Sequence, residues 1–123
     1  MSQKKVYKIL SVDDWEKSKK IGFIKTAVDQ QDGFIHFSNA NQLAASLEFY
    51  FAGHEEVVLL LPKMSKIESK LKYETAGANS KRRGVFAHLY ADLKIEDIEK
   101  SWKIRREALR LPESILLEAE SSI

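Results

Sequence analysis

The stretch Asp32–Ser38, DGFIHFS, carries both the fold signal and the first candidate site residues. It has the pattern of a β-strand, in which side chains two residues apart share one face of the sheet. Phe34, His36 and Ser38 therefore point the same way, and the apolar residues between them point the other way. A buried polar group without a hydrogen-bond partner costs about 1–3 kcal/mol. His36 and Ser38 thus need partners, either within a core or in a ligand pocket.

A second strand repeats this arrangement near the end of the chain. In VFAHLYA, residues 85–91, Phe86, His88 and Tyr90 share one face. If the two strands lie in one sheet, two imidazoles and two hydroxyls converge on one patch, which favours a pocket. The alternative is that each histidine is an ordinary core residue with a satisfied side chain. The third histidine, His54, stands in a loop sequence, and we expect it to be exposed.

Glu74, at the end of a predicted strand over residues 71–74, is a further candidate. It is followed by a loop, TAGANSKRRG, that contains Arg82 and Arg83. Arginine suits bidentate recognition of phosphate, and loop glycines let backbone N–H groups approach an anion. We therefore predict that this loop covers the pocket and that both arginines bind a ligand phosphate. A solvated strand end and a solvated loop are the alternatives.

The remaining pattern predicts an α+β fold. The apolar run Val57–Leu61, closed by Pro62, is typical of a central strand buried on both faces. Ser11 is suited to cap a helix that runs to about Lys20 and stops at Gly22. A second helix follows Asn39 and ends at Gly53. The other predicted strands cover residues 6–10, 34–38, 71–74, 85–90 and 102–104, and a helical turn covers 95–98. The tail, about 105–123, reads either as a short helix or as an arm.

Composition narrows the functional classes. The chain has 123 residues, and we expect one domain over residues 1–123. Its formal net charge of +2 gives no strong signal for nucleic acid. The absence of cysteine excludes disulfides, thiolate catalysis and cysteine-ligated zinc. The histidine spacing predicts no metal site. Neither a signal peptide nor a membrane-spanning stretch is recognisable, so we expect a cytoplasmic protein with no membrane partner.

The chain resembles a bacterial family of uncharacterised proteins, domain of unknown function nine-five-two. The resemblance covers about residues 5–104. It rests on DGFIHFS and on FAHLY, with shorter matches at VYKI, Trp15, Asp29, Gln42, FAG and LKYE. This family is described as similar in structure to the ADP-ribosyltransferases, which have a split sheet around a cleft that holds NAD. The resemblance therefore implies a compact α+β fold with a split β-sheet around a cleft and two main helices.

The resemblance also implies roles for the site residues. His36 corresponds to the early-strand histidine that contacts a ribose of NAD, with Ser38 as its neighbour. Glu74 and His88 match later motifs of the family, and Tyr90 follows. The chain departs from the family pattern in four places, which leaves the aim of His88 in particular open. Alanine replaces a usual proline at Ala87 and a usual glycine at Ala91, tyrosine replaces tryptophan at Tyr73, and Lys81, Arg82 and Arg83 replace a shorter glycine-rich segment.

Three functional hypotheses follow, and no cofactor is certain in any of them. In the first, the protein is an NAD-utilising transferase or glycohydrolase that binds NAD or an ADP-ribose derivative. His36, Glu74 and His88 would be catalytic, and the ligand-binding residues would be Phe34, Ser38, Arg82, Arg83, Phe86 and Tyr90. In the second, His36 and His88 are the general base and general acid of a phosphoesterase that acts on a small nucleotide. In the third, the chain is a small-ligand-binding or regulatory module without turnover. The expected partner is a small molecule, either a nucleotide or another phosphate-containing compound. The oligomeric state stays open.

Overall fold

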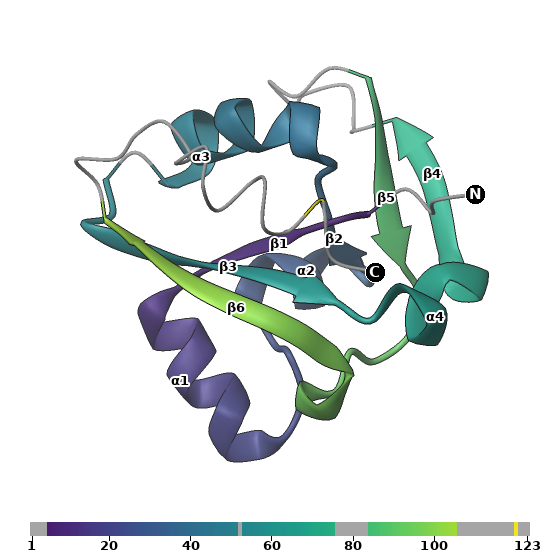
Figure 1. Cartoon of the computed structure of the whole chain (residues 1–123), viewed down its shortest axis with the longest axis horizontal. Helices are drawn as coiled ribbons and strands as arrows, with labels where there is room; N and C mark the ends of the chain where they lie inside the picture. Colours follow the sequence, from purple (N-terminus) through teal and green to yellow (C-terminus); the bar gives the residue numbers. More distant parts are fainter. Residues whose placement is uncertain (1–4, 52, 76–83, 106–119, 121–123) are drawn as a thin grey trace.

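The computed structural model describes residues 5–51, 53–75, 84–105 and 120. The first of its two sheets is antiparallel and has the strand order β1-β3-β6 (Figure 1). Its strands are β1 (Lys8–Ser11), β3 (Glu56–Pro62) and β6 (Ile98–Arg105). β3 is central and almost wholly buried, which confirms the interpretation of the apolar run.

The second sheet is also antiparallel and has the strand order β2-β5-β4. Its strands are β2 (Ile35–His36), β5 (Val85–Leu89) and β4 (Leu71–Thr75). The two sheets meet at a bridge between Tyr7 and Ser38, whose backbone groups exchange two hydrogen bonds of 2.7 and 2.9 Å. The described chain is therefore α+β, with two small antiparallel sheets joined at one point.

The strand predicted over residues 34–38 is divided at this junction. Phe37 N–H still donates to the Ala87 carbonyl on the β5 side, at 3.0 Å, whereas Ser38 already pairs with Tyr7. The chain thus passes from one sheet to the other within two residues, so that regular pairing in β2 is limited to Ile35–His36. β6 is longer than the predicted residues 102–104 because it pairs with β3 along the whole of β3.

The helices are short and surround the sheets. They are α1 (Val12–Ile21), α2 (Ala27–Asp32), α3 (Leu43–Phe51) and α4 (Met64–Ile67), with 3-10 turns η1 (Ala40–Gln42), η2 (Glu68–Lys70) and η3 (Ile95–Asp97). Ser11 caps α1 and Gly22, at φ 92°, ends it, as predicted. α2 and α4 were not predicted, because four to six residues carry too little periodicity to indicate a helix.

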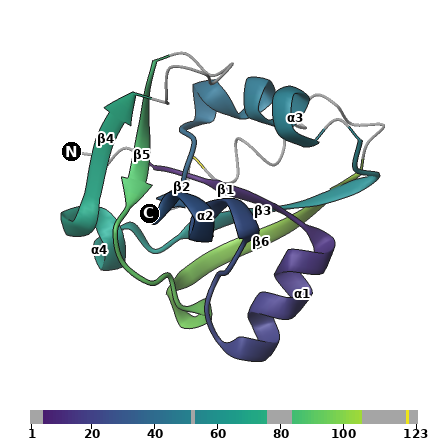
Figure 2. The same ribbon diagram turned by 180° about the vertical axis from the view of Figure 1, so that it is seen from behind.

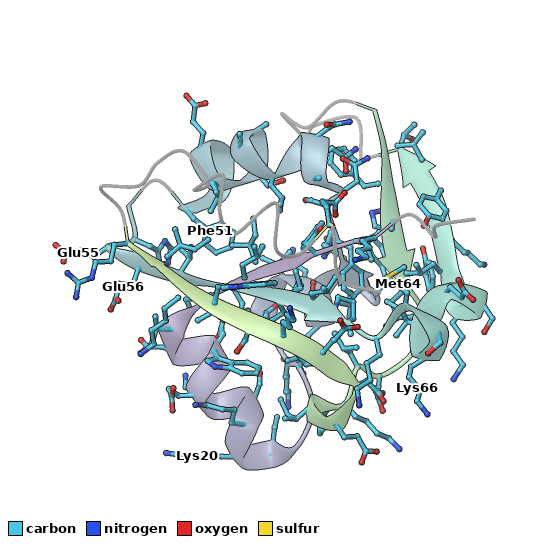
Figure 3. All side chains as sticks on the ribbon, in the orientation of Figure 1. Lys20, Phe51, Glu55, Glu56, Met64 and Lys66 are labelled. Carbon is cyan, nitrogen blue, oxygen red and sulfur yellow. The ribbon has the colours of Figure 1, made fainter. Side chains whose placement is uncertain are left out.

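The core has two parts, one on each face of the β1-β3-β6 sheet. Leu60 packs on the α1 side, and Leu59 packs on the α3 side. Figures 1 and 2, which view the molecule from opposite sides, both show α1 and α3 on opposite sides of this sheet. Figure 3 shows the buried Met64 side chain inside the molecule, while the exposed Lys20 and Lys66 extend outward. β3 therefore contributes to both halves of the core.

Most of the tail predicted over residues 105–123 lies outside the described residues. Within the described part of the chain, Glu120 accepts a hydrogen bond from the buried Tyr7 hydroxyl. Burial, together with this contact, raises the pKa of Tyr7. No helix among the described residues is long and apolar enough to cross a membrane.

Candidate functional site

Two histidines face each other across the second sheet. His36 on β2 and His88 on β5 are register partners, and their ring centroids lie 5.5 Å apart. Phe34 stacks on His88 at 4.1 Å and lies 4.6 Å from His36 and 5.2 Å from Tyr90. We call these four side chains the ring cluster. Its members come from two segments about fifty residues apart, and antiparallel pairing of β2 with β5 brings them together.

Glu74 on β4 contacts two members of the ring cluster, His88 and Tyr90. Its Oε1 lies 2.8 Å from His88 Nδ1 and accepts a 2.7 Å hydrogen bond from the Tyr90 hydroxyl. The hydrogen bond from His88, followed by that from Tyr90, lowers the pKa of Glu74. The same contact with Glu74 raises the pKa of Tyr90. At neutral pH the site therefore presents an ionised, partly exposed carboxylate beside a buried imidazole.

His36 lies between two carboxylates of α2. Its Nδ1 is 2.6 Å from Asp29 Oδ1, and its Nε2 is 2.9 Å from Asp32 Oδ2. Asp29 also accepts the backbone N–H of His36, at 3.2 Å, and forms an ion pair with the buried Lys8 of β1. Asp29 is the buried and Asp32 the exposed one of these two carboxylates. Because a carboxylate only accepts hydrogen bonds, a neutral imidazole can donate to only one of them.

Comparison with known proteins assigns the chain to a family. Residues 9–101 match the family described as protein of unknown function (DUF952). The chain belongs to this family. The matched range includes His36, Glu74 and His88, whereas Lys8 lies just before it. No protein with a curated description matches the chain.

Solved structures of one protein from Caulobacter crescentus are similar to this fold. The crystal structure of protein CC0527 from Caulobacter crescentus has a TM-score of 0.70 and 32% sequence identity, covering 80% of this chain and 84% of that chain. The solution NMR structure of CC0527 has a TM-score of 0.68 and 32% identity, covering 82% and 84%. The likeness thus extends over most of both chains.

The structure separates Ser38 from the ring cluster. Its buried Oγ lies 2.9 Å from Ser46 Oγ on α3, although we expected it beside His36 and paired with His88 and Tyr90. The expected alternation fails at this point because the chain changes sheets after Phe37. Ser38 is therefore a link between β1, β2 and α3.

The other predicted ligand-binding residues have different outcomes. Phe86 is buried on β5, and its contact with a ligand stays a prediction. His54 is exposed, as expected, and its ring lies 5.3 Å from that of Phe51. Arg82 and Arg83 lie outside the described residues, so their contact with a ligand phosphate stays a prediction. Among the described residues, no cluster of His, Asp and Glu is arranged to hold a metal ion.

Sequence reasoning did not find the support behind His36. Lys8 stands alone in the apolar segment VYKIL, a signal that a buried lysine there needs a carboxylate partner. In the sequence, Asp32 directly before Gly33 has the pattern of a turn, and Asp29 lies just before the predicted strand without a sign of its partners. Both belong to α2, whose single turn and a half places them beside the His36 ring.

The free energy of unfolding, measured at decreasing pH, tests whether Asp29 is charged in the folded protein. Burial alone would raise the pKa of Asp29, but the hydrogen bond from His36 and the charge of Lys8 outweigh burial and hold it below the usual value. The folded chain thus binds this proton less tightly than the unfolded chain. The contribution of Asp29 to stability is complete above the pKa of an aspartate in the unfolded chain, about 3.9. It is lost as the pH falls toward the lowered pKa of the folded state. We expect Asp29→Asn to flatten the acid side of the stability curve, measured by urea unfolding between pH 2 and about 6.

The control is Asp13→Asn, which removes an exposed carboxylate from the first turn of α1. That variant should lose stability at low pH in the same way as the parent protein. An Asp29→Asn curve that remains parallel to the parent curve at low pH would contradict the assignment.

Proposed function

We propose that the ring cluster with Glu74 binds NAD or an ADP-ribose derivative and acts on it in an ADP-ribosyltransferase-like manner. The observation that carries the proposal is the convergence of His36, His88 and Glu74: both imidazoles lie against Phe34, and Glu74 contacts His88. Tyr90 is 45% exposed and the His36 side chain 19%, so a ligand has access to both. A site that combines aromatic faces, imidazoles and a carboxylate suits a nucleoside with ribose hydroxyls.

The sheet arrangement supports the same proposal. The family resemblance implies a split sheet around a cleft, and among the described residues the sheets β1-β3-β6 and β2-β5-β4 are linked by the backbone bridge between Tyr7 and Ser38. This order is compatible with an ADP-ribosyltransferase-like fold. The ring cluster lies on β2 and β5, next to the junction.

Each residue of the site has a role in the proposed chemistry. The bond between the ribose C1′ and the nicotinamide nitrogen breaks, and nicotinamide leaves with the electron pair. Positive charge then grows on the ribose, and Glu74, ionised because of its contacts with His88 and Tyr90, stabilises it. His36 binds a ribose hydroxyl, and Tyr90 packs against a ring of the ligand. Water or another acceptor adds to C1′ and releases its proton.

One observation favours the phosphoesterase as second candidate. Both imidazoles face a carboxylate through Nδ1, so acid and base catalysis would have to use the two Nε2 atoms. Within the described part of the chain, Nε2 of His88 has no hydrogen-bond partner, whereas Nε2 of His36 contacts Asp32. This asymmetry makes His88 the candidate that can act without a rearrangement. A binding module without turnover has the same geometry and differs only in product formation.

The proposal is tested by NMR titration of the labelled full chain with NAD, ADP-ribose and a 2′,3′-cyclic nucleotide. We expect NAD or ADP-ribose to give saturable shifts of the His36 and His88 ring signals. His36→Ala should weaken binding by about 10- to 150-fold, equivalent to the roughly 1.5–3 kcal/mol of a charge-assisted hydrogen bond.

His54→Ala is the matched control, because it removes an exposed histidine outside the ring cluster. A folded His36→Ala variant with unchanged affinity would overturn the proposal. Shifts and turnover with the cyclic nucleotide alone would favour the phosphoesterase, and saturable binding without product would favour the binding module. If all three ligands leave both rings unchanged, the histidines are structural.

A further inference from the structure

A charged pair is buried directly behind His36. Lys8 of β1 and Asp29 of α2 are 5% and 6% exposed. Lys8 Nζ lies 2.9 Å from Asp29 Oδ1 and 2.7 Å from Oδ2. Removing two charges from water costs several kcal/mol per ion, so a buried pair is a poor way to gain stability alone. The position of this pair beside the site suggests a second role.

The contacts of Asp29 determine which nitrogen of His36 carries a proton. An ionised carboxylate only accepts hydrogen bonds, so Nδ1, 2.6 Å from Oδ1, must be the donor. The second bond from the backbone N–H of His36 fixes the ring relative to β2. The other nitrogen, Nε2, points toward the exposed side, where Asp32 Oδ2 lies 2.9 Å away.

We propose that Lys8 and Asp29 are positioning residues of the site. Lys8 orients the Asp29 carboxylate and keeps it ionised, and Asp29 holds the proton of His36 on Nδ1. A ligand that displaces the exposed Asp32 carboxylate would then meet Nε2 of His36. Among the described residues, the charged and titratable groups around the ring are Lys8, Asp29, Asp32 and, on the neighbouring strand, His88.

The role of Lys8 and Asp29 in ligand binding rests on the proposed function. Their effect on the position of the His36 ring proton does not. The proton position can be measured in the free protein by long-range ¹H–¹⁵N correlation of the imidazole nitrogens. We would record these spectra on the full chain at about pH 8, where a free imidazole is mostly neutral. His36 of the parent protein should carry its proton on Nδ1.

Asp29→Asn should move the proton toward Nε2, because an amide can donate to Nδ1 and support the other tautomer. We expect Nδ1 to be protonated in fewer than about half of the molecules. His88, held by Glu74 instead, should keep its signals. Asp32→Asn is the control, since it changes a carboxylate at the other nitrogen and should leave the proton on Nδ1.

Asp29→Asn takes a carboxylate away from the buried Lys8, so the double variant Lys8→Met/Asp29→Asn is measured as well. It removes both charges and should show the same loss of the Nδ1 proton. A parent protein with the proton on Nε2, or an unchanged tautomer in either variant, would overturn the proposal.

Ligand titration separates this proposal from the proposed function. If NAD or ADP-ribose binds the parent protein, the variants that lose the Nδ1 proton should bind about 10- to 100-fold more weakly, as when the partner behind a metal-binding histidine is removed. Unchanged affinity would assign the pair a purely structural role. If no nucleotide binds the parent protein, the proposed function fails, while the tautomer spectra still decide whether Lys8 and Asp29 orient His36.

Discussion

Lys8→Met should lower the free energy of unfolding by about 3–5 kcal/mol, the usual cost of removing one member of a buried ion pair. Methionine keeps most of the side-chain volume, so packing changes little. Asp29, however, retains a charge that is 6% exposed and loses the partner that contacts both of its oxygens. Urea unfolding followed by circular dichroism measures the loss.

Lys19→Met is the matched control for this prediction. Lys19 forms a 3.0 Å ion pair with Glu16 on the surface of α1, where both side chains are nearly half exposed. Such pairs are worth about 0–1 kcal/mol. The double variant Lys8→Met/Asp29→Asn should recover part of the stability, since no buried charge remains. If Lys8→Met costs no more than Lys19→Met, the interpretation of a tightly coupled buried pair is wrong.

Leu59→Ala and Leu60→Ala should each cost about 2–5 kcal/mol, although the two side chains point to opposite faces of β3. Leu60 is fully buried between β3 and α1, and Leu59 is equally buried on the α3 side. Each truncation leaves a cavity in a different half of the core. Comparable losses in urea unfolding would be expected only of a central strand.

Val28→Ala serves as control, because Val28 is an exposed apolar residue on α2. Its truncation should stay within about 0.5 kcal/mol of the parent protein. A large loss for one leucine and a small loss for the other would place one face of β3 against solvent.

Local patterns were sufficient for several elements of the fold. The run Val57–Leu61 predicted a central strand because only a strand covered on both faces can be apolar throughout. Ser11 and Gly22 marked the ends of α1 through interactions within a few residues of the chain. The alternation around His36 and His88 placed each ring on the same face as its aromatic neighbour. These features depend on the pleat and on helix ends, which a short segment defines by itself.

Long-range pairing decided the rest of the candidate site. Alternation indicated that His36 and His88 could share a face, but only the register of β2 with β5 places them opposite each other. Ser38 followed the same local pattern as His36, yet pairing with Tyr7 moved it to another environment. A single residue of difference in pairing changes which side chains meet, and local sequence does not encode that register.

Interactions between chain neighbours are therefore enough to predict the strand faces, the helix ends and the central position of β3. The residue types also indicate that an imidazole–carboxylate site can form. Tertiary structure alone decided that Lys8 and Asp29, 21 residues apart, meet behind His36 and that Glu74 bonds His88 and Tyr90. The physical reason is the range of the interactions. Alternation and capping act between neighbours in the chain, whereas a buried charge finds its partner only when separate elements pack together.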